Sequence, residues 1–201
     1  MWLCSPIHGP VLKKNSRSES SRPVLYTVGH STHQIETFLG LLSQQDIAVL
    51  ADVRSFPSSR RWPQYNQAEL QRSVENAQIL YRWFKSLGGR RNSKRPDSPH
   101  TAWREAAFRS YADYTESADF ENGLHELVEL ALAKRTAIMC SEGLWWQCHR
   151  RIISDHLTAR GWEVRHIMPD GKLVPHVLAD FATVRAGHVI YDGGQHALNL
   201  K

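Results

Sequence analysis

Short apolar runs alternate with amphipathic segments over most of this 201-residue chain. This alternation constrains the fold more than any other feature, because strands that alternate with helices form βαβ units and a mostly parallel sheet. Runs rich in β-branched and aromatic residues predict strands over residues 24–28, 47–51, 79–84, 136–140 and 163–167. We therefore expect an α/β fold whose sheet carries helices on both faces.

The segments between these runs carry apolar residues at helical spacing. Ser31 and Gln34 have the spacing of a capping box, as do Asn66 and Glu69, so helices are predicted to start at Ser31 and Asn66. Further helices are expected over residues 101–117, over residues 120–131 and over about residues 147–160.

Composition divides the chain into three parts. Residues 1–22 carry Pro, Ser and alternating charge without periodicity, which predicts a disordered leader in which Cys4 has no assigned role. Residues 23–176 form the expected single α/β domain. Residues 177–201 form a C-terminal extension whose order the pattern leaves open, although residues 189–194 fit a strand and a turn.

The cysteine count and the hydropathy bear on the compartment. The chain has three cysteines, an odd number, and no stretch approaches the roughly 18 apolar residues of a membrane span. Its start lacks the pattern of a signal peptide. We therefore expect a cytoplasmic protein with reduced thiols and no membrane association.

The net charge suggests the kind of partner. At +5, with a pI near 9.3, the chain is expected to bind an anion, either a phosphate-bearing small molecule or a nucleic acid. Several of the seven tryptophans lie beside arginines, an arrangement that suits stacking on a base and also ordinary packing. Composition does not indicate an oligomeric state or a cofactor.

Polar segments follow four of the predicted strands. They are residues 29–31 (GHS), 52–54 (DVR), 140–142 (CSE) and 166–169 (HIMP). Because ligands of open parallel sheets bind at the carboxyl ends of the strands, these segments are expected to share one site.

The motifs "TVGHST", "ADVRSFPSSRRWPQYN", "LGGRR", "FRSYADY" and "CSEGLWWQCHRRIISDHLTARGWEVRHI" resemble the domain of unknown function 488 family. The resemblance is collinear over about residues 24–168. It implies a three-layer, Rossmann-like α/β arrangement and carries no settled activity. The family's polar motifs correspond here to Gly29, His30, Ser31, Asp52, Arg54, Gly88, Gly89, Arg90, Arg109, Tyr111, Cys140, Glu142, Cys148, His149 and Arg150.

Candidate catalytic groups come from these segments. Glu142 follows a strand end, where a carboxylate can serve as a general acid, a general base or a nucleophile. Cys148 is predicted in the first turn of a helix, where the backbone amides favour a thiolate. Asp52 and His30 complete the catalytic set. The expected substrate- or anion-binding residues are Ser31, Arg54, Tyr65, Arg90, Arg109, Tyr111 and Arg150.

Each role has a structural alternative. A cysteine that ends a buried strand can be an inert core thiol, and Glu142 can simply pair with Arg54 or Arg150. Thiolate and imidazole also suit zinc, so Cys140, Cys148 and His149 form an alternative metal set, although a closed site needs four ligands.

These residues support three hypotheses. The first is a hydrolase or group-transfer enzyme that acts on a phosphate-bearing substrate such as a nucleotide or a nucleic-acid component. The second is a nucleic-acid-binding module without catalysis, in which basic loops grip phosphates and an aromatic ring such as Trp62 stacks on a base. The third is a thiolate metal or redox site.

Overall fold

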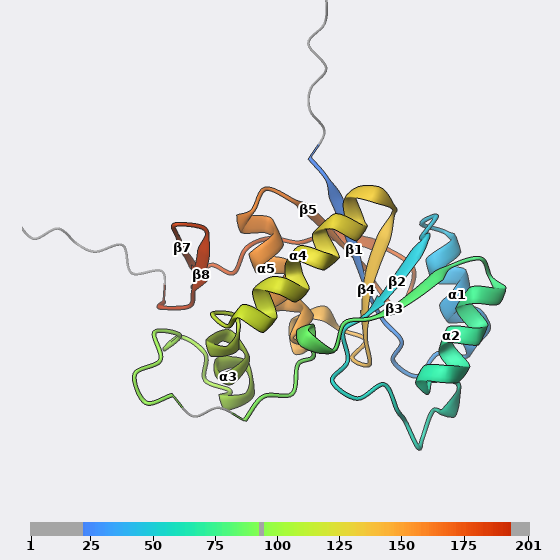
Figure 1. The fold of residues 1–201 in the computed structure, drawn as a ribbon, viewed down its shortest axis with the longest axis horizontal. Coiled ribbons are helices and arrows are strands. Elements are labelled where there is room, and N and C mark those ends of the chain that lie inside the picture. The colour runs from blue at the N-terminus through green and yellow to red at the C-terminus, as the bar shows by residue number, and fades with distance from the viewer. Residues whose placement is uncertain (1–21, 93–94, 194–201) are drawn as a thin grey trace, which may run out of the picture.

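The computed structural model describes residues 22–92 and 95–193, so residues 1–21 of the expected leader, with Cys4, lie outside the described part. A six-stranded sheet in the order β3-β2-β4-β1-β5-β6 forms the centre (Figure 1). The first five strands are parallel and β6 is an antiparallel edge strand, which confirms the mostly parallel sheet. The strands are β1 (Val24–Gly29), β2 (Val49–Asp52), β3 (Leu80–Trp83), β4 (Thr136–Cys140), β5 (Glu163–Ile167) and β6 (Leu173–Pro175).

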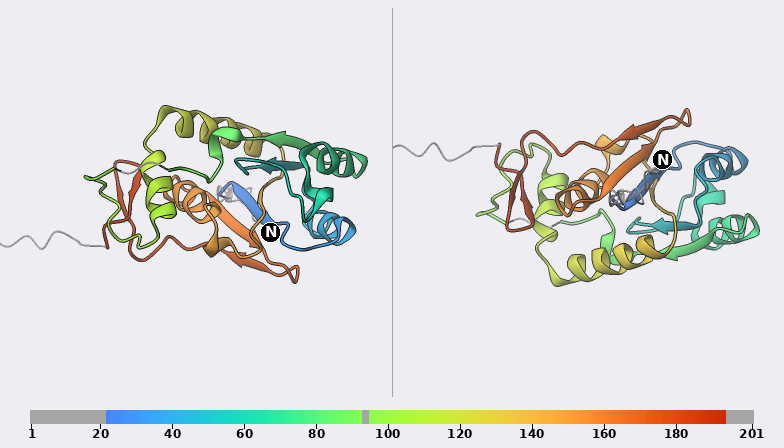
Figure 2. Two further views of the ribbon diagram at one scale, coloured as in Figure 1. Left: turned by 90° about the horizontal axis from the view of Figure 1, so that it is seen from below. Right: turned by 90° about the horizontal axis from the view of Figure 1, so that it is seen from above.

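Helices cover both faces of this sheet. One face packs against α1 (Ile35–Ser43) and α2 (Gln67–Asn76) through a core that includes Phe38 and Leu70. The other face packs against α3, α4 and α5, and Figure 2 shows the strands between the two groups of helices. This confirms the three-layer α/β arrangement. The remaining helices are α3 (Ala106–Tyr114), α4 (Ala118–Ala133) and α5 (Arg150–Ala159), with 3-10 turns at Pro63–Tyr65, Lys85–Leu87 and Trp145–Gln147.

The helix predicted to start at Ser31 begins at Ile35 instead, and Gln34 is its N-cap. The reason is tertiary. The backbone amide of His30 donates to the carbonyl of Cys140 at 3.0 Å, and that of Ser31 donates to Ser141 at 2.9 Å. These bonds hold the loop against the end of β4, and Ser31 takes a φ of +48° that is incompatible with capping a helix.

Two other helix starts depend on loop contacts. Asn66 is the N-cap of α2 as expected, but its side chain accepts a hydrogen bond from the Ser59 amide at 2.6 Å and does not cap the helix. The expected capping box at Asn66 is therefore not formed. Helix α5 begins only at Arg150, so the prediction that Cys148 lies in its first turn is wrong. A 3-10 turn that ends at Gln147 precedes Cys148, so the helix begins after Cys148.

The described end of the chain packs back onto the domain. A two-stranded antiparallel hairpin, β7 (Thr183–Arg185) and β8 (His188–Ile190), leads to the fully buried Tyr191. The Tyr191 hydroxyl donates to Asp155 of α5 at 2.8 Å, and its carbonyl accepts from the Ala102 amide at 2.9 Å. Within the described residues, no helix is long and apolar enough to cross a bilayer.

Candidate functional site

The loops after β1 and β4 meet at the carboxyl edge of the sheet. These strands are neighbours, yet β1 continues into α1 on one face and β4 leads to α5 on the other, which opens a crevice between the two loops. Gly29 allows them to touch. A Cβ at this position would overlap the carbonyl of Glu142 and lie 2.8 Å from the Cα of Gly143.

A cavity of about 1080 Å³ opens at this edge. The loop after β2 adds a wall that includes Ser55, Phe56, Arg61 and Trp62, and Phe108 of α3 also lines the cavity. The sequence-predicted site residues that line the cavity are His30, Ser31, Arg54, Arg90, Tyr111, Cys140, Glu142, Cys148 and His149. Those that do not line it are Asp52, Tyr65, Arg109 and Arg150.

Asp52 and Arg54 form a buried ion pair, with Arg54 Nη2 2.6 Å from Asp52 Oδ2. Asp52 also accepts from the Tyr81 hydroxyl at 2.7 Å and from the Arg54 amide at 3.0 Å. Burial lowers the pKa of Arg54, but the Asp52 carboxylate outweighs it and the pKa is raised. Both carboxylate oxygens of Asp52 accept hydrogen bonds from Arg54 or Tyr81, and the residue has no exposed surface. Asp52 therefore orients Arg54 at the cavity wall and does not itself line the cavity.

His30 presents one unpaired ring nitrogen. Its ring stacks on Tyr65, with centroids 3.9 Å apart, and its Nδ1–H donates to the carbonyl of Ser31 at 3.0 Å. The other nitrogen, Nε2, is buried and has no hydrogen-bond partner among the described residues. Burial, and then the nearby Arg54, lower the pKa of His30 to about 4, so the imidazole is neutral near pH 7 and Nε2 carries a lone pair.

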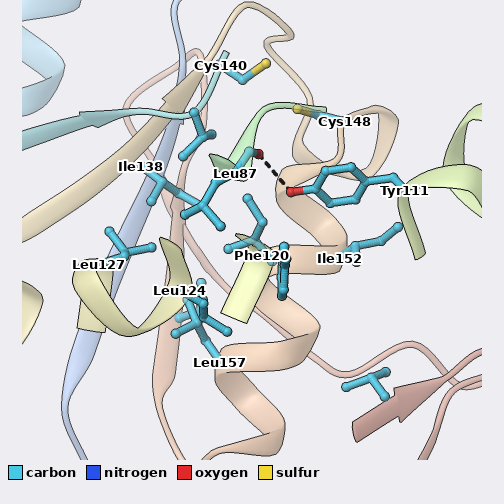
Figure 3. Packing of buried hydrophobic residues seen from close by; sticks show 14 of the residues in the cluster. Leu87, Tyr111, Phe120, Leu124, Leu127, Ile138, Cys140, Cys148, Ile152 and Leu157 are labelled. Carbon is cyan, nitrogen blue, oxygen red and sulfur yellow. Dashed lines mark hydrogen bonds between the residues drawn. The ribbon is translucent and has the colours of Figure 1, made fainter. Parts of the chain in front are cut away.

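The floor of the cavity brings two sulfur atoms and an imidazole together. Cys140 Sγ lies 3.9 Å and Cys148 Sγ lies 3.5 Å from Nδ1 of His149. Figure 3 shows both thiols at one end of the apolar cluster formed by β4, α4 and α5. Hydrogen bonding to Cys148, and then burial, raise the pKa of Cys140 to about 12. Burial would raise the pKa of Cys148 as well, but a hydrogen bond from Cys140 and the charge and hydrogen bonds of Arg150 lower this pKa to about 6.

Arg150 supports this floor from below. Its side chain is buried, and it donates to Cys148 Sγ at 3.4 Å, to Thr27 Oγ1 at 3.4 Å and to the carbonyl of Glu142. None of these acceptors is a carboxylate. Arg150 has no carboxylate hydrogen-bonded to it among the described residues, and a buried guanidinium of this kind favours negative charge nearby, so Arg150 stabilises the thiolate form of Cys148.

A chain of hydrogen bonds connects Arg150 to a distant carboxylate. Thr27 Oγ1 lies 2.7 Å from His166 Nδ1, His166 Nε2 lies 3.0 Å from His176 Nδ1, and His176 Nε2 lies 3.0 Å from Asp155 Oδ1. Arg150 only donates hydrogen bonds and the Asp155 carboxylate only accepts them. One choice of histidine tautomers therefore lets every hydrogen bond of the chain donate in the same direction, from Arg150 towards Asp155. The buried Arg150 is thus connected to the Asp155 carboxylate through Thr27, His166 and His176.

The family model described as "Domain of unknown function DUF488" matches residues 34–157, more than half of the chain. The chain belongs to this family. No curated protein and no solved structure matches it. The segment matched by DUF488 contains Arg54, Arg90, Glu142 and the sulfur–imidazole floor, whereas the loop that carries His30 lies before it. The description of DUF488 assigns no activity.

Three other residues predicted for the site of this DUF488 chain differ from one another in how they relate to the cavity. Glu142 has an exposed side chain at the cavity, and it forms neither of the expected pairs with Arg54 and Arg150, since Arg150 binds its carbonyl. Tyr111 donates its hydroxyl to the Leu87 carbonyl at 2.8 Å and places its ring against His149. Arg109 donates to the Trp103 carbonyl at 2.7 Å, away from the cavity lining.

Sequence reasoning missed several participants. Ser55 and Phe56 line the cavity, and the Ser55 hydroxyl accepts from the Arg90 amide at 2.8 Å, which ties two loops together. Their position directly after β2 was the available signal. His176 and Asp155 had no such signal, because they lie in the C-terminal segment and in the middle of α5, and only the fold brings them together.

Proposed function

We propose that this cavity is the active site of a hydrolase or group-transfer enzyme that acts on a phosphate-bearing substrate, such as a nucleotide or a nucleic-acid component. The observation that carries the proposal is that cationic side chains and electron-pair donors line the same cavity. Phosphoryl chemistry needs both, because the substrate's charge must be held while a nucleophile or a base acts on it.

The cationic wall comes from two loops. Arg61 follows β2 and Arg90 follows β3, and their guanidinium groups lie over the rings of Trp62 and Phe56, at 5.5 Å and 5.9 Å from the ring centroids. A phosphate between the loops would receive charge-assisted hydrogen bonds from both arginines. Arg54 also lines the wall, where the Asp52 carboxylate balances its charge and holds its guanidinium in place.

The reactive groups line the same cavity. His30 Nε2 is a neutral acceptor without a competing partner among the described residues, so it would take a proton from an attacking group. Glu142, exposed at the cavity, would hold or return a proton. The sulfur–imidazole floor, which includes Cys148, would supply the reactive centre.

Turnover assays with defined variants test this function. The purified chain is incubated with nucleoside mono-, di- and triphosphates and with short oligonucleotides, and products are identified by mass spectrometry. We expect His30→Gln to lower kcat at least about 100-fold, because it removes a proton acceptor. Arg90→Ala should raise KM about tenfold, through loss of a charge-assisted hydrogen bond, whereas Arg72→Ala, on an exposed part of α2, should change neither constant. Absence of turnover on every substrate would refute the proposal.

A nucleic-acid-binding module without catalysis is the second candidate. It is favoured by Phe56, which is 63% exposed at the cavity beside Arg90, because an exposed ring next to a cation suits stacking on an unpaired base. Binding of single-stranded oligonucleotides that weakens steeply with salt, lost in Phe56→Ala and unaccompanied by turnover, would select this function. Weak, salt-insensitive binding would exclude it.

A further inference from the structure

Three electron-pair donors converge at the floor of the cavity. The two sulfurs of Cys140 and Cys148 and Nδ1 of His149 all lie within 4.8 Å of one another. A tetrahedral zinc ion separates sulfur from nitrogen ligands by about 3.6 Å and sulfur from sulfur by about 3.8 Å, as its bond lengths require. In this structure the sulfur–nitrogen separations are 3.5 Å for Cys148 and 3.9 Å for Cys140. The sulfur–nitrogen separations thus fit one ion, and the sulfur–sulfur separation is within 4.8 Å, against the roughly 3.8 Å that zinc requires.

The tautomer of His149 is set by a second contact. Its Nε2 lies 2.9 Å from the carbonyl oxygen of Val53, which can only accept, so Nε2 carries the hydrogen. The lone pair is therefore on Nδ1, which faces the two sulfurs. A backbone carbonyl that orients the far nitrogen of an imidazole is the usual outer contact of a metal-ligating histidine.

Further contacts hold the ring and one sulfur in place. Gly89 lies against the imidazole of His149, and a Cβ there would overlap the ring, so the ring position depends on this glycine. Arg150 donates to Cys148 Sγ, a bond that orients the sulfur and offsets negative charge on it. The donor set is thus positioned by Val53 directly after β2, by Gly89 in the loop after β3 and by Arg150 of α5.

We propose that Cys140, Cys148 and His149 bind one zinc-like divalent transition-metal ion, with its remaining coordination position open to the cavity. Sulfur and imidazole donors select such an ion over magnesium or calcium, which prefer oxygen. Among the described residues the cluster offers three ligands, the number typical of zinc sites that bind water or substrate in the fourth position.

The proposal deepens the proposed function and rests on it for the role of the ion. Two thiolates neutralise a divalent ion, so the nearby guanidinium of Arg150 leaves the floor net positive and suited to an anionic substrate. A water molecule in the open position would lose a proton more readily than free water, with His30 as the proton acceptor. Its oxygen would bond to phosphorus as the ester P–O bond breaks, and Glu142 would protonate the alkoxide that leaves.

Metal analysis of the full chain tests the site without reference to activity. The protein is purified under reducing conditions, dialysed against chelator-treated buffer and titrated with Zn²⁺ and Co²⁺. We expect close to one ion per chain, and thiolate-to-cobalt charge-transfer absorption together with the visible bands of tetrahedral Co²⁺. Cys140→Ser, Cys148→Ser and His149→Gln should each weaken binding at least tenfold, whereas Cys4→Ser should leave it unchanged.

The outcomes separate this inference from the proposed function. Folded, reduced wild type that binds neither ion at stoichiometric concentration, or binds cobalt without sulfur charge transfer, would overturn the metal site. If that protein still turned over a phosphate ester, the enzyme would remain and Cys148 would act as a free thiolate. Conversely, stoichiometric metal in a protein without turnover would support the site and refute the enzyme. Because titration of the wild type needs no variant, misfolding of a substituted chain does not affect the result.

Discussion

Replacement of His156 should reduce the amount by which the free energy of unfolding falls at acidic pH. His156 lies on α5 with 1% of its surface exposed, its ring packs against Phe120, and its Nε2 has no hydrogen-bond partner among the described residues. Burial, followed by the positive charge of Arg160 and by His100 and His188, lowers the pKa of His156 to about 3. The native state therefore keeps this imidazole neutral under mildly acidic conditions.

The magnitude follows from proton linkage. An unfolded histidine has a pKa of about 6.5, so between about pH 6.5 and pH 3 the unfolded chain binds a proton at His156 that the native chain does not bind. Stability contributed by the neutral group is complete above pH 6.5 and is lost as the pH falls. At pH 5 the loss from this one group is about 2 kcal/mol, and at pH 7.5 it is close to zero.

Urea unfolding at the two pH values measures the effect. Tryptophan fluorescence gives the free energy of unfolding at pH 7.5 and at pH 5 for wild type and His156→Gln, and the drop between the two pH values should be about 2 kcal/mol smaller in the variant. The control is His125→Gln, whose side chain is 74% exposed on α4, and it should retain the wild-type drop. An equal drop in wild type and His156→Gln would refute the reasoning.

Two further predictions concern stability. Gly29→Ala should destabilise the fold by about 3 kcal/mol, because the new Cβ overlaps backbone, whereas Gly40→Ala, where a Cβ meets nothing within 4 Å, should stabilise α1 by about 0.5–1 kcal/mol. Equal effects in thermal unfolding would contradict the close approach of the loops. Asp52→Asn should cost about 3–5 kcal/mol in urea unfolding, because the buried Arg54 loses its counter-charge, while Glu69→Gln at an exposed pair should cost less than about 1 kcal/mol. Similar losses in the two variants would show that the buried pair contributes no more to the free energy of unfolding than the exposed pair.

The strands were predictable because parallel strands covered on both faces are apolar along their length. Residues 24–28 and 136–140 show this pattern, and both correspond to strands at the centre of the sheet. Helix starts were less predictable, since capping depends on which partner a side chain finds. Asn66 has the right spacing for a capping box, but Ser59, seven residues away, offers an amide that its side chain binds instead.

The site was predictable only in part. Strand-end logic leads to His30 and Cys140, because parallel strands bring their carboxyl ends to one edge. The same reasoning could not distinguish Asp52 from Arg54. Asp52 is buried and its oxygens are hydrogen-bonded to Arg54 and Tyr81, whereas Arg54, two residues later, lines the cavity. That difference depends on the Tyr81 hydroxyl from a neighbouring strand, a contact that no local pattern encodes.

The sequence by itself determined the alternation of strand and helix, the parallel sheet and the edge at which its polar segments gather, because hydrophobic period and turn chemistry are local properties. Only the tertiary structure decided what the gathered groups can do. The Val53 carbonyl directs Nδ1 of His149 toward two sulfurs, and Arg150 reaches Cys148 from below. These contacts require that segments distant in the sequence be positioned to within a few tenths of an ångström, which only the packing of the folded chain achieves.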